Sequence, residues 1–234
     1  MSSLQIPLFH GTSTIFLNGI IKNQLGGVNP ILELDAYNFV KDLWPHVKAH
    51  LSDDSNFNAR IGSFSRMVRQ TTGPMNFQHG DTYLSPARST AIRYASNKRY
   101  GSEILTYALG FLEELVRRDV EGIRNVLYRK YPQVFSLLDI SPSPILIEVI
   151  DCPLDFLRTE AGDDAEFQIV ELMELWNEKR DLFEVVGQQK NFRLSRPVPI
   201  EKMKFWMLNV LKWDPFFPEY QMIRIDLNDM RSSS

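Results

Sequence analysis

Residues 145–150 constrain the fold more than any other part of the sequence. They form a nearly continuous run of apolar, mostly β-branched side chains that is interrupted only by Glu148, and they follow the Ser- and Pro-rich linker at 141–144. Such a run is typical of a central strand in a sheet. With 234 residues, of which 44% are hydrophobic and 24% charged, the chain has the composition of a globular protein with a sizeable core, and its length fits one large domain, or two small ones at most.

Helical and strand-like patterns alternate around this run. We expect helices at residues 15–21, 34–51, 61–68, 86–95, 103–138, 165–179 and 200–211. We expect strands at residues 6–10, 81–85, 145–150, 183–186, 191–194 and 221–227. The pattern therefore predicts an α+β fold, in which residues 103–140 form a helical insertion in a single domain that covers residues 1–234.

Several breaks and caps within these elements also follow from the sequence. Pro45 is expected to kink or break its helix, and the polar stretch 52–58 is expected to be a loop. Ser13 or Thr14 would cap the first helix after a turn at residues 11–13. The breaks in the long helical tract are expected at Gly110, Gly122 and Pro132.

Composition excludes several classes of protein. The single cysteine, Cys152, cannot form an internal disulfide or a structural zinc site. His46 and His50 are spaced like metal ligands on a helix but have no nearby third ligand, so we expect no metal site. The sequence has neither a signal-peptide pattern nor an apolar stretch of about 18 residues. We expect a cytoplasmic protein, or a toxin delivered into a target cell without a leader.

The strongest functional signal joins two segments about 70 residues apart. The first is Leu8-Phe9-His10-Gly11-Thr12-Ser13, and the second combines Thr82-Tyr83-Leu84-Ser85 with Thr90-Ala91-Ile92-Arg93-Tyr94-Ala95. This pair resembles the first two motifs of the NAD-dependent ADP-ribosyltransferase superfamily, in its His-Tyr-Glu branch. The resemblance rests on about fifteen residues, and it implies a split antiparallel β core with helical insertions and NAD as the substrate.

The residue types suit the roles that the resemblance implies. His10 can hydrogen-bond a ribose hydroxyl, and Gly11 lets the backbone approach the nicotinamide carboxamide. Tyr83 and Tyr94 can sandwich the nicotinamide ring by stacking and by cation–π attraction. Thr90 can hydrogen-bond the amide. Thr12 completes the expected set of NAD-binding residues.

The third family motif is where the sequence departs from the pattern. The family places a Glu about eight residues before an Ile/Val-Pro step, where it holds the ribose 2′-OH and stabilises an oxocarbenium-like transition state. Counting back from Pro199 gives Asn191, and Gln189 would lie two residues earlier on the same strand face. Three explanations stay open: Glu184 or Glu148 is the true carboxylate, the enzyme works with an amide, or the chain is an inactive form.

The net charge of −3 hides two segments of opposite charge. Residues 57–102 contain seven basic residues and one acidic residue, a net charge of +6, whereas residues 148–184 contain twelve acidic and three basic residues, a net charge of −9. A positive segment suits a dinucleotide donor and attracts a nucleic-acid acceptor. A basic antitoxin or a chaperone would suit the acidic surface.

The resemblance thus implies transfer of ADP-ribose from NAD to a macromolecular acceptor, with nucleic acid, RNA or DNA, favoured. Family members of this kind are often bacterial or phage-related toxins, toxin–antitoxin components or phage-defence effectors. The alternatives are a protein-modifying ADP-ribosyltransferase effector, an enzyme similar to RNA 2′-phosphotransferases, and an inactive NAD-binding or interaction module. No membrane partner is expected.

Overall fold

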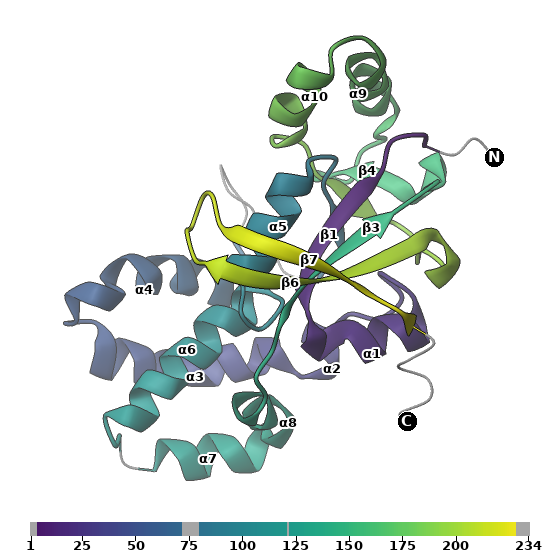
Figure 1. Cartoon of the computed structure of the whole chain (residues 1–234). Coiled ribbons are helices and arrows are strands. Elements are labelled where there is room, and N and C mark those ends of the chain that lie inside the picture. The colour runs from purple at the N-terminus through teal and green to yellow at the C-terminus, as the bar shows by residue number, and fades with distance from the viewer. Residues whose placement is uncertain (1–3, 72–79, 121, 228–234) are drawn as a thin grey trace. The chain divides into compact units, whose positions relative to one another are not determined.

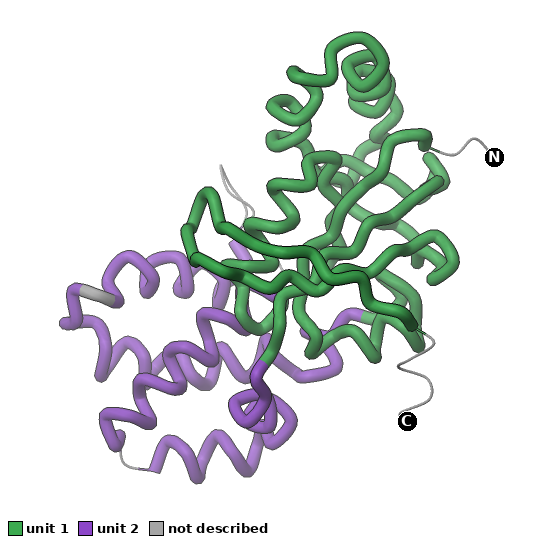
Figure 2. Tube along the Cα trace, viewed as in Figure 1, with its two compact units in different colours: residues 1–28, 81–101, 142–234 green, residues 29–80, 102–141 purple. Residues whose placement is uncertain are grey.

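The structure is a computed structural model that describes residues 4–71, 80–120 and 122–227. The chain divides into two compact units (Figure 2), of which the first comprises residues 1–28, 81–101 and 142–234 and the second residues 29–80 and 102–141. The segment expected as a helical insertion lies in the second unit together with residues 29–80. That the whole chain acts as one domain stays a prediction.

The first unit contains two antiparallel sheets, and Figure 1 labels their strands. The first sheet has the order β1-β3-β6-β7 and consists of β1 (Leu8–Ser13), β3 (Pro144–Val149), β6 (Met203–Lys212) and β7 (Glu219–Ile225). The second has the order β2-β5-β4 and consists of β2 (Tyr83–Leu84), β5 (Phe192–Leu194) and β4 (Leu157–Thr159). The α+β class expected from the sequence is confirmed.

The central position of β3 explains its continuous apolar run. β3 pairs with β1 on one side and with β6 on the other. Ile145 and Ile147 belong to the larger core cluster of this unit, whereas Leu146 belongs to a smaller cluster with Phe9 and Leu208. Since neighbouring residues of a strand point to opposite faces, both faces of β3 are buried.

Four helices accompany these sheets in the described part of the first unit. They are α1 (Thr14–Asn23), α5 (Arg88–Asn97), α9 (Glu166–Glu178) and α10 (Arg180–Gly187). Two short 3₁₀ turns, Leu154–Phe156 and Ile200–Lys202, precede β4 and β6. Ser13 caps α1 as expected, because its hydroxyl oxygen accepts a hydrogen bond of 3.4 Å from the Ile15 N–H.

The end of the central strand leads into the buried Cys152. The carbonyl of Cys152 accepts a hydrogen bond of 2.9 Å from the Leu4 N–H, and its side chain belongs to the larger core cluster. Burial raises the pKa of the thiol to about 12. The thiol is therefore protonated at neutral pH.

Two elements differ in type from the sequence prediction. Residues 183–186, expected as a strand, lie in α10, where Phe183 is buried against Trp176 of α9 with ring centroids 4.9 Å apart. Residues 200–211, expected as a helix, form a 3₁₀ turn and then β6. Apolar side chains occur on both faces of the first half of β6, so the sequence does not alternate there as a half-buried strand would. Long-range pairing with β3 and β7 decides the structure instead.

Several boundaries also differ. The expected turn at residues 11–13 is part of β1, which extends to Ser13, and the expected loop at 52–58 overlaps the start of α4 (Ser55–Val68). In the second unit α3 (Ala36–Leu51) runs through Pro45, and α6 (Glu103–Arg117) runs through Gly110. The expected breaks at Gly122 and Pro132 do separate helices.

A glycine allows β1 and α5 to pack closely. A Cβ at Gly11 would lie 2.0 Å from the carbonyl oxygen of Ala91 and 3.0 Å from the amide nitrogen of Ala95. Both alanines are buried in the cluster that also contains Phe9. Only glycine fits at this position of β1, because the backbone of α5 occupies the space that a side chain would need.

The described residues of the second unit form helices and a 3₁₀ turn. Besides α3, α4 and α6 these are α2 (Pro30–Glu33), α7 (Ile123–Lys130), α8 (Pro132–Ser136) and the turn Leu137–Asp139. Aromatic rings connect three of the helices. Phe64 of α4 lies between Trp44 of α3, at a centroid distance of 6.1 Å, and Phe111 of α6, at 5.0 Å.

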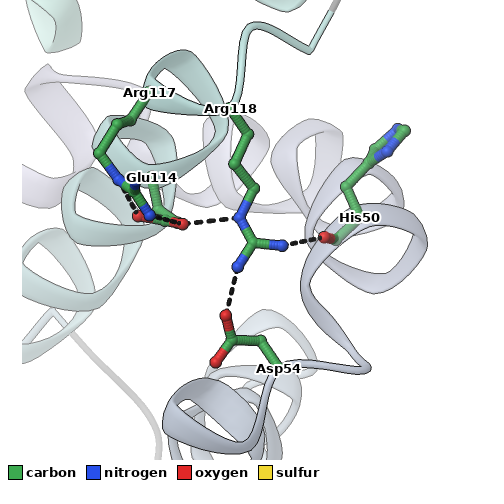
Figure 3. A network of polar contacts seen from close by, with 5 residues as sticks. All are labelled: His50, Asp54, Glu114, Arg117 and Arg118. Atoms are coloured by element: carbon green, nitrogen blue, oxygen red, sulfur yellow. Dashed lines mark hydrogen bonds and ion pairs between the residues drawn. The ribbon is translucent and has the colours of Figure 1, made fainter.

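A polar network joins α6 to the end of α3 and the start of α4 (Figure 3). Glu114, which is mostly buried, accepts hydrogen bonds from Arg117 and Arg118 at 2.5–2.8 Å. Arg118 also donates to the His50 carbonyl at 2.9 Å and pairs with Asp54. The hydrogen bond from Arg117, with a further contribution from Arg118, holds the pKa of Glu114 below its ordinary value.

Substitution of Gly11 by Ala is expected to lower the free energy of unfolding by about 1–3 kcal/mol, because the new methyl group overpacks the contact with α5. Gly19→Ala in α1 is the matched control. Nothing lies within 4 Å of a Cβ there, so the free energy of unfolding should rise by roughly 0.5–1 kcal/mol. Urea unfolding curves measure both changes. A Gly11→Ala protein as stable as the wild type would contradict the packing described for β1.

Glu114→Gln is expected to lower the stability of the second unit by about 1 kcal/mol at neutral pH, a modest effect because Arg117 is exposed to solvent. The depressed pKa of Glu114 means that its stabilisation is complete above the unfolded-state pKa of about 4.3 and disappears as the pH falls through the folded-state value. Urea unfolding between pH 3 and pH 7 should therefore show a shallower acid loss in the variant. Glu33→Gln, an exposed change in α2, serves as the control, and identical pH profiles for the wild type and Glu114→Gln would refute the assignment.

Candidate functional site

Two of the predicted site residues, one from each of the first two motifs, meet where the two sheets adjoin. Phe9 of β1 and Ser85, which follows β2, exchange two backbone hydrogen bonds of 2.8 Å. Immediately beside this bridge, the Nδ1 atom of His10 lies 2.9 Å from the carbonyl oxygen of Tyr83. The structure thus brings His10 and Tyr83, 73 residues apart, into direct contact.

The chemistry of this contact fixes the hydrogen-bonding character of His10. A carbonyl oxygen only accepts, so the hydrogen of the neutral ring resides on Nδ1 and Nε2 is left as an acceptor. Burial lowers the pKa of His10, while the hydrogen bond to Tyr83 acts in the opposite direction. His10 is therefore a neutral imidazole at pH 7, with an acceptor atom suited to a hydroxyl group.

The residues that follow His10 have structural uses. The Cβ position of Gly11 points at α5, so the missing side chain serves helix packing, and its backbone contact with nicotinamide stays a prediction. Thr12 is buried, and its hydroxyl donates a hydrogen bond of 3.4 Å to the Gly101 carbonyl. This hydrogen bond gives Thr12 a structural role, and the binding of NAD by Thr12 stays a prediction.

Helix α5 carries the other two predicted NAD-binding residues. Tyr94 is 37% exposed. The Oγ1 atom of Thr90 is buried and has no hydrogen-bond partner among the residues that the structure describes. An unpaired hydroxyl on this helix is compatible with the expected amide contact, because a buried polar atom ordinarily finds a partner.

Both alternative carboxylates already have structural partners. Glu184 of α10 accepts hydrogen bonds from the Ser89 N–H at 3.2 Å and from the Ser89 hydroxyl at 2.5 Å, at the start of α5. Glu148 of β3 contacts Lys204 Nζ at 3.2 Å and Trp206 Nε1 at 3.3 Å, both on β6. Glu184 thus caps a helix, and Glu148 connects two strands.

Asn191 and Gln189 are not arranged as the sequence predicted. β5 begins at Phe192, so Asn191 directly precedes it. Gln189 lies exposed in the turn after α10, where its N–H donates to the Val186 carbonyl at 3.0 Å. The expected placement of both residues on one strand face is therefore wrong, because the strand is shorter than the sequence pattern indicated.

A second polar residue, Glu160, lies beside Asn191, and the sequence pattern does not single it out. β4 and β5 pair Thr159 with Phe192, and the residues just beyond this pair are Glu160 and Asn191. The Asn191 Nδ2 atom donates a hydrogen bond of 2.7 Å to Glu160 Oε1. A carboxylate is thus held beside the amide at the position where the resemblance implies a Glu. The short β4 gives no clear periodic signal, so the pairing was not readable from the sequence.

The basic segment 57–102 is divided between the two units. Arg60, Arg66 and Arg69 belong to the second unit, whereas four cations belong to the first unit: Arg88, Arg93, Lys98 and Arg99. The guanidinium of Arg88 lies 5.2 Å from the ring centroid of Phe9, next to His10. The first unit thus contains four of the seven cations of this segment.

Metal-binding and membrane-spanning features are both missing from the described part of the chain. No group of three or more His, Cys, Asp or Glu side chains that could hold a metal ion occurs among the described residues. Within residues 4–71, 80–120 and 122–227, none of the helices has both the length and the apolar composition of a membrane span.

Comparison of the chain with protein-family models, curated proteins and solved structures found no match.

Proposed function

We propose that this chain is an ADP-ribosyltransferase that transfers ADP-ribose from NAD to a macromolecular acceptor, with nucleic acid as the acceptor class. The contact between His10 Nδ1 and the Tyr83 carbonyl carries the proposal. It supports the proposal because the two residues that define the resemblance, which are distant in sequence, meet at the junction of two antiparallel sheets. A split antiparallel core is the fold that the resemblance implies.

The proposed roles begin with NAD binding. His10 presents Nε2 as an acceptor to a ribose hydroxyl, and Tyr83 with Tyr94 stacks on the nicotinamide ring. The unpaired Oγ1 of Thr90 receives the carboxamide group. Positioning of this kind contributes much of a rate enhancement, because the reacting atoms no longer have to find each other.

In the proposed reaction an acceptor nucleophile forms a bond to C1′ of the nicotinamide ribose. The C1′–N bond breaks, and its electron pair leaves with nicotinamide, which becomes neutral. The acceptor loses its proton to the solvent. Positive charge builds up on the ribose in the transition state, so a fixed negative charge nearby lowers the barrier.

Glu160 is the proposed source of that negative charge. Asn191 cannot supply it. Glu148 is paired with the cation of Lys204, and Glu184 caps α5, whereas the partner of Glu160 is a neutral amide. The Glu160 carboxylate is kept beside Asn191 by a hydrogen bond of 2.7 Å. In this arrangement the amide contacts the ribose and positions Glu160, which acts as the catalytic carboxylate. With these roles the chain is proposed to be an active enzyme and not an inactive NAD-binding module.

Incubation with NAD labelled in its adenylate part, and with separate pools of RNA, DNA and protein, tests the activity. We expect release of nicotinamide together with label on the nucleic acid. His10→Ala should weaken NAD binding at least about fivefold, the equivalent of one neutral hydrogen bond of about 1 kcal/mol. His50→Ala, an exposed change in the second unit, should leave NAD binding unchanged. Absence of both nicotinamide release and label would contradict the proposed activity, and label on the protein pool alone would contradict its acceptor class.

Glu160→Gln is expected to slow nicotinamide release roughly 100-fold with little change in the affinity for NAD, as for the loss of one electrostatic group in a transition state. Glu160→Gln combined with Asn191→Glu should restore most of the rate, because the carboxylate then stands directly before β5, at the position that contacts residue 160. Asn191→Glu alone places two carboxylates side by side and is less informative. Glu178→Gln, at the end of α9, is the matched control. An unchanged rate for Glu160→Gln would show that this residue does not act on the ribose.

A further inference from the structure

The loop between β6 and β7 exposes aromatic side chains. We call residues 213–218, Trp-Asp-Pro-Phe-Phe-Pro, the aromatic loop. The exposed fractions of Trp213, Phe216 and Phe217 are 63%, 65% and 85%. Side chains of this size are usually buried, and three exposed rings on one short loop indicate a contact surface.

The aromatic loop has a defined structure. Asp214 Oδ1 accepts hydrogen bonds from the N–H groups of Phe216 and Phe217 at 2.8 and 2.7 Å. These bonds hold the pKa of Asp214 below its ordinary value. Pro215 and Pro218 restrict the backbone further. The rings are therefore presented on a braced turn, so the loop loses little conformational entropy when a ligand binds.

The aromatic loop is attached to the end of α5. The Asn97 side chain donates a hydrogen bond of 3.0 Å from Nδ2 to the Pro215 carbonyl, and Figure 1 shows the β6–β7 turn beside this helix. Tyr94 precedes Asn97 by three residues, which is roughly 4.5 Å of helix rise. The same helix thus carries a residue of the proposed NAD site and the anchor of the aromatic loop.

The charges at this end of α5 favour an anionic ligand. Arg93, Lys98 and Arg99 lie on the last turns of α5 and directly after it. Glu219, directly after the aromatic loop, pairs with Lys212 at 3.5 Å, and Asp214 within the loop accepts the hydrogen bonds of the loop backbone. Aromatic rings next to cations match the bases and phosphates of a single strand.

We propose that the aromatic loop and the cationic end of α5 form a binding surface for single-stranded nucleic acid. Bases stack on Trp213, Phe216 and Phe217, and phosphates contact Arg93 and Lys98. Stacking on rings of this kind tolerates any sequence, because every base has a flat face. As an acceptor site this surface rests on the proposed function, whereas binding of the strand itself needs no NAD.

The test measures binding of fluorescein-labelled oligothymidylate and oligouridylate of about 20 nucleotides by anisotropy, without NAD. The wild-type chain should bind these oligonucleotides. The double variant Trp213→Ala/Phe217→Ala should bind them at least about 25-fold more weakly, or about fivefold for each ring removed. Arg93→Gln with Lys98→Gln should reduce the slope of log K against log salt by about 1.4, or about 0.7 for each phosphate that the variant no longer neutralises. Thermal unfolding checks that the variants remain folded.

Matched controls come from exposed residues of the same unit. Phe167, which is 83% exposed on α9, and Leu182 of α10 supply an apolar control as Phe167→Ala with Leu182→Ala. Lys22→Gln with Lys179→Gln supplies the charge control. Both control proteins should bind the oligonucleotides as the wild type does.

Other occupants would appear as distinct results. No oligonucleotide binding, or equal binding by the loop variant, overturns the inference. The inference is also overturned if the loop is needed for binding to phosphatidylserine vesicles but the chain binds no oligonucleotide. A dimer that sedimentation shows to depend on the loop, again without oligonucleotide binding, has the same consequence. Nicotinamide release without oligonucleotide binding would remove this inference alone, whereas oligonucleotide binding without any nicotinamide release would remove the proposed function alone.

Discussion

The contact between Gly11 and the backbone of α5 sets the geometry of the first unit. A carbonyl oxygen of the helix occupies the position that a Cβ of β1 would take, so the strand and the helix approach as closely as two backbones can. This approach determines where α5 carries Thr90, Tyr94 and Asn97. The proposed NAD site and the attachment of the aromatic loop therefore depend on one glycine, although the glycine need not contact any ligand.

Local sequence patterns are sufficient to predict the elements whose neighbours lie close in sequence or whose burial is complete. β3 was recognisable because both of its faces are buried, α9 because its apolar residues recur at helical spacing, and the cap of α1 because Ser13 stands directly before it. β6 was not recognisable, since its apolar residues are spread over both faces. α10 was not, because its β-branched residues favour a strand, and its burial against α9 outweighs that preference.

The same division applies to the candidate site. The resemblance implies that His10 and Tyr83 both contact NAD, and the structure places the ring of His10 in contact with the backbone carbonyl of Tyr83. The sequence did not predict that Glu160 lies beside Asn191, because their proximity arises from the pairing of two three-residue strands that are distant in the chain. The sequence offers Glu148 and Glu184 as candidate catalytic carboxylates. In the structure Glu148 contacts Lys204 and Trp206, and Glu184 contacts Ser89 at the start of α5.

The buried Cys152 gives the chain an internal reporter. It is the single cysteine of the sequence, it lies three residues after the central strand β3, and burial raises its pKa to about 12. The thiolate is the nucleophile that attacks a labelling reagent, so labelling requires that the surrounding core first opens. The labelling rate then reports the local opening free energy of the first unit by itself, in a chain whose second unit carries no thiol.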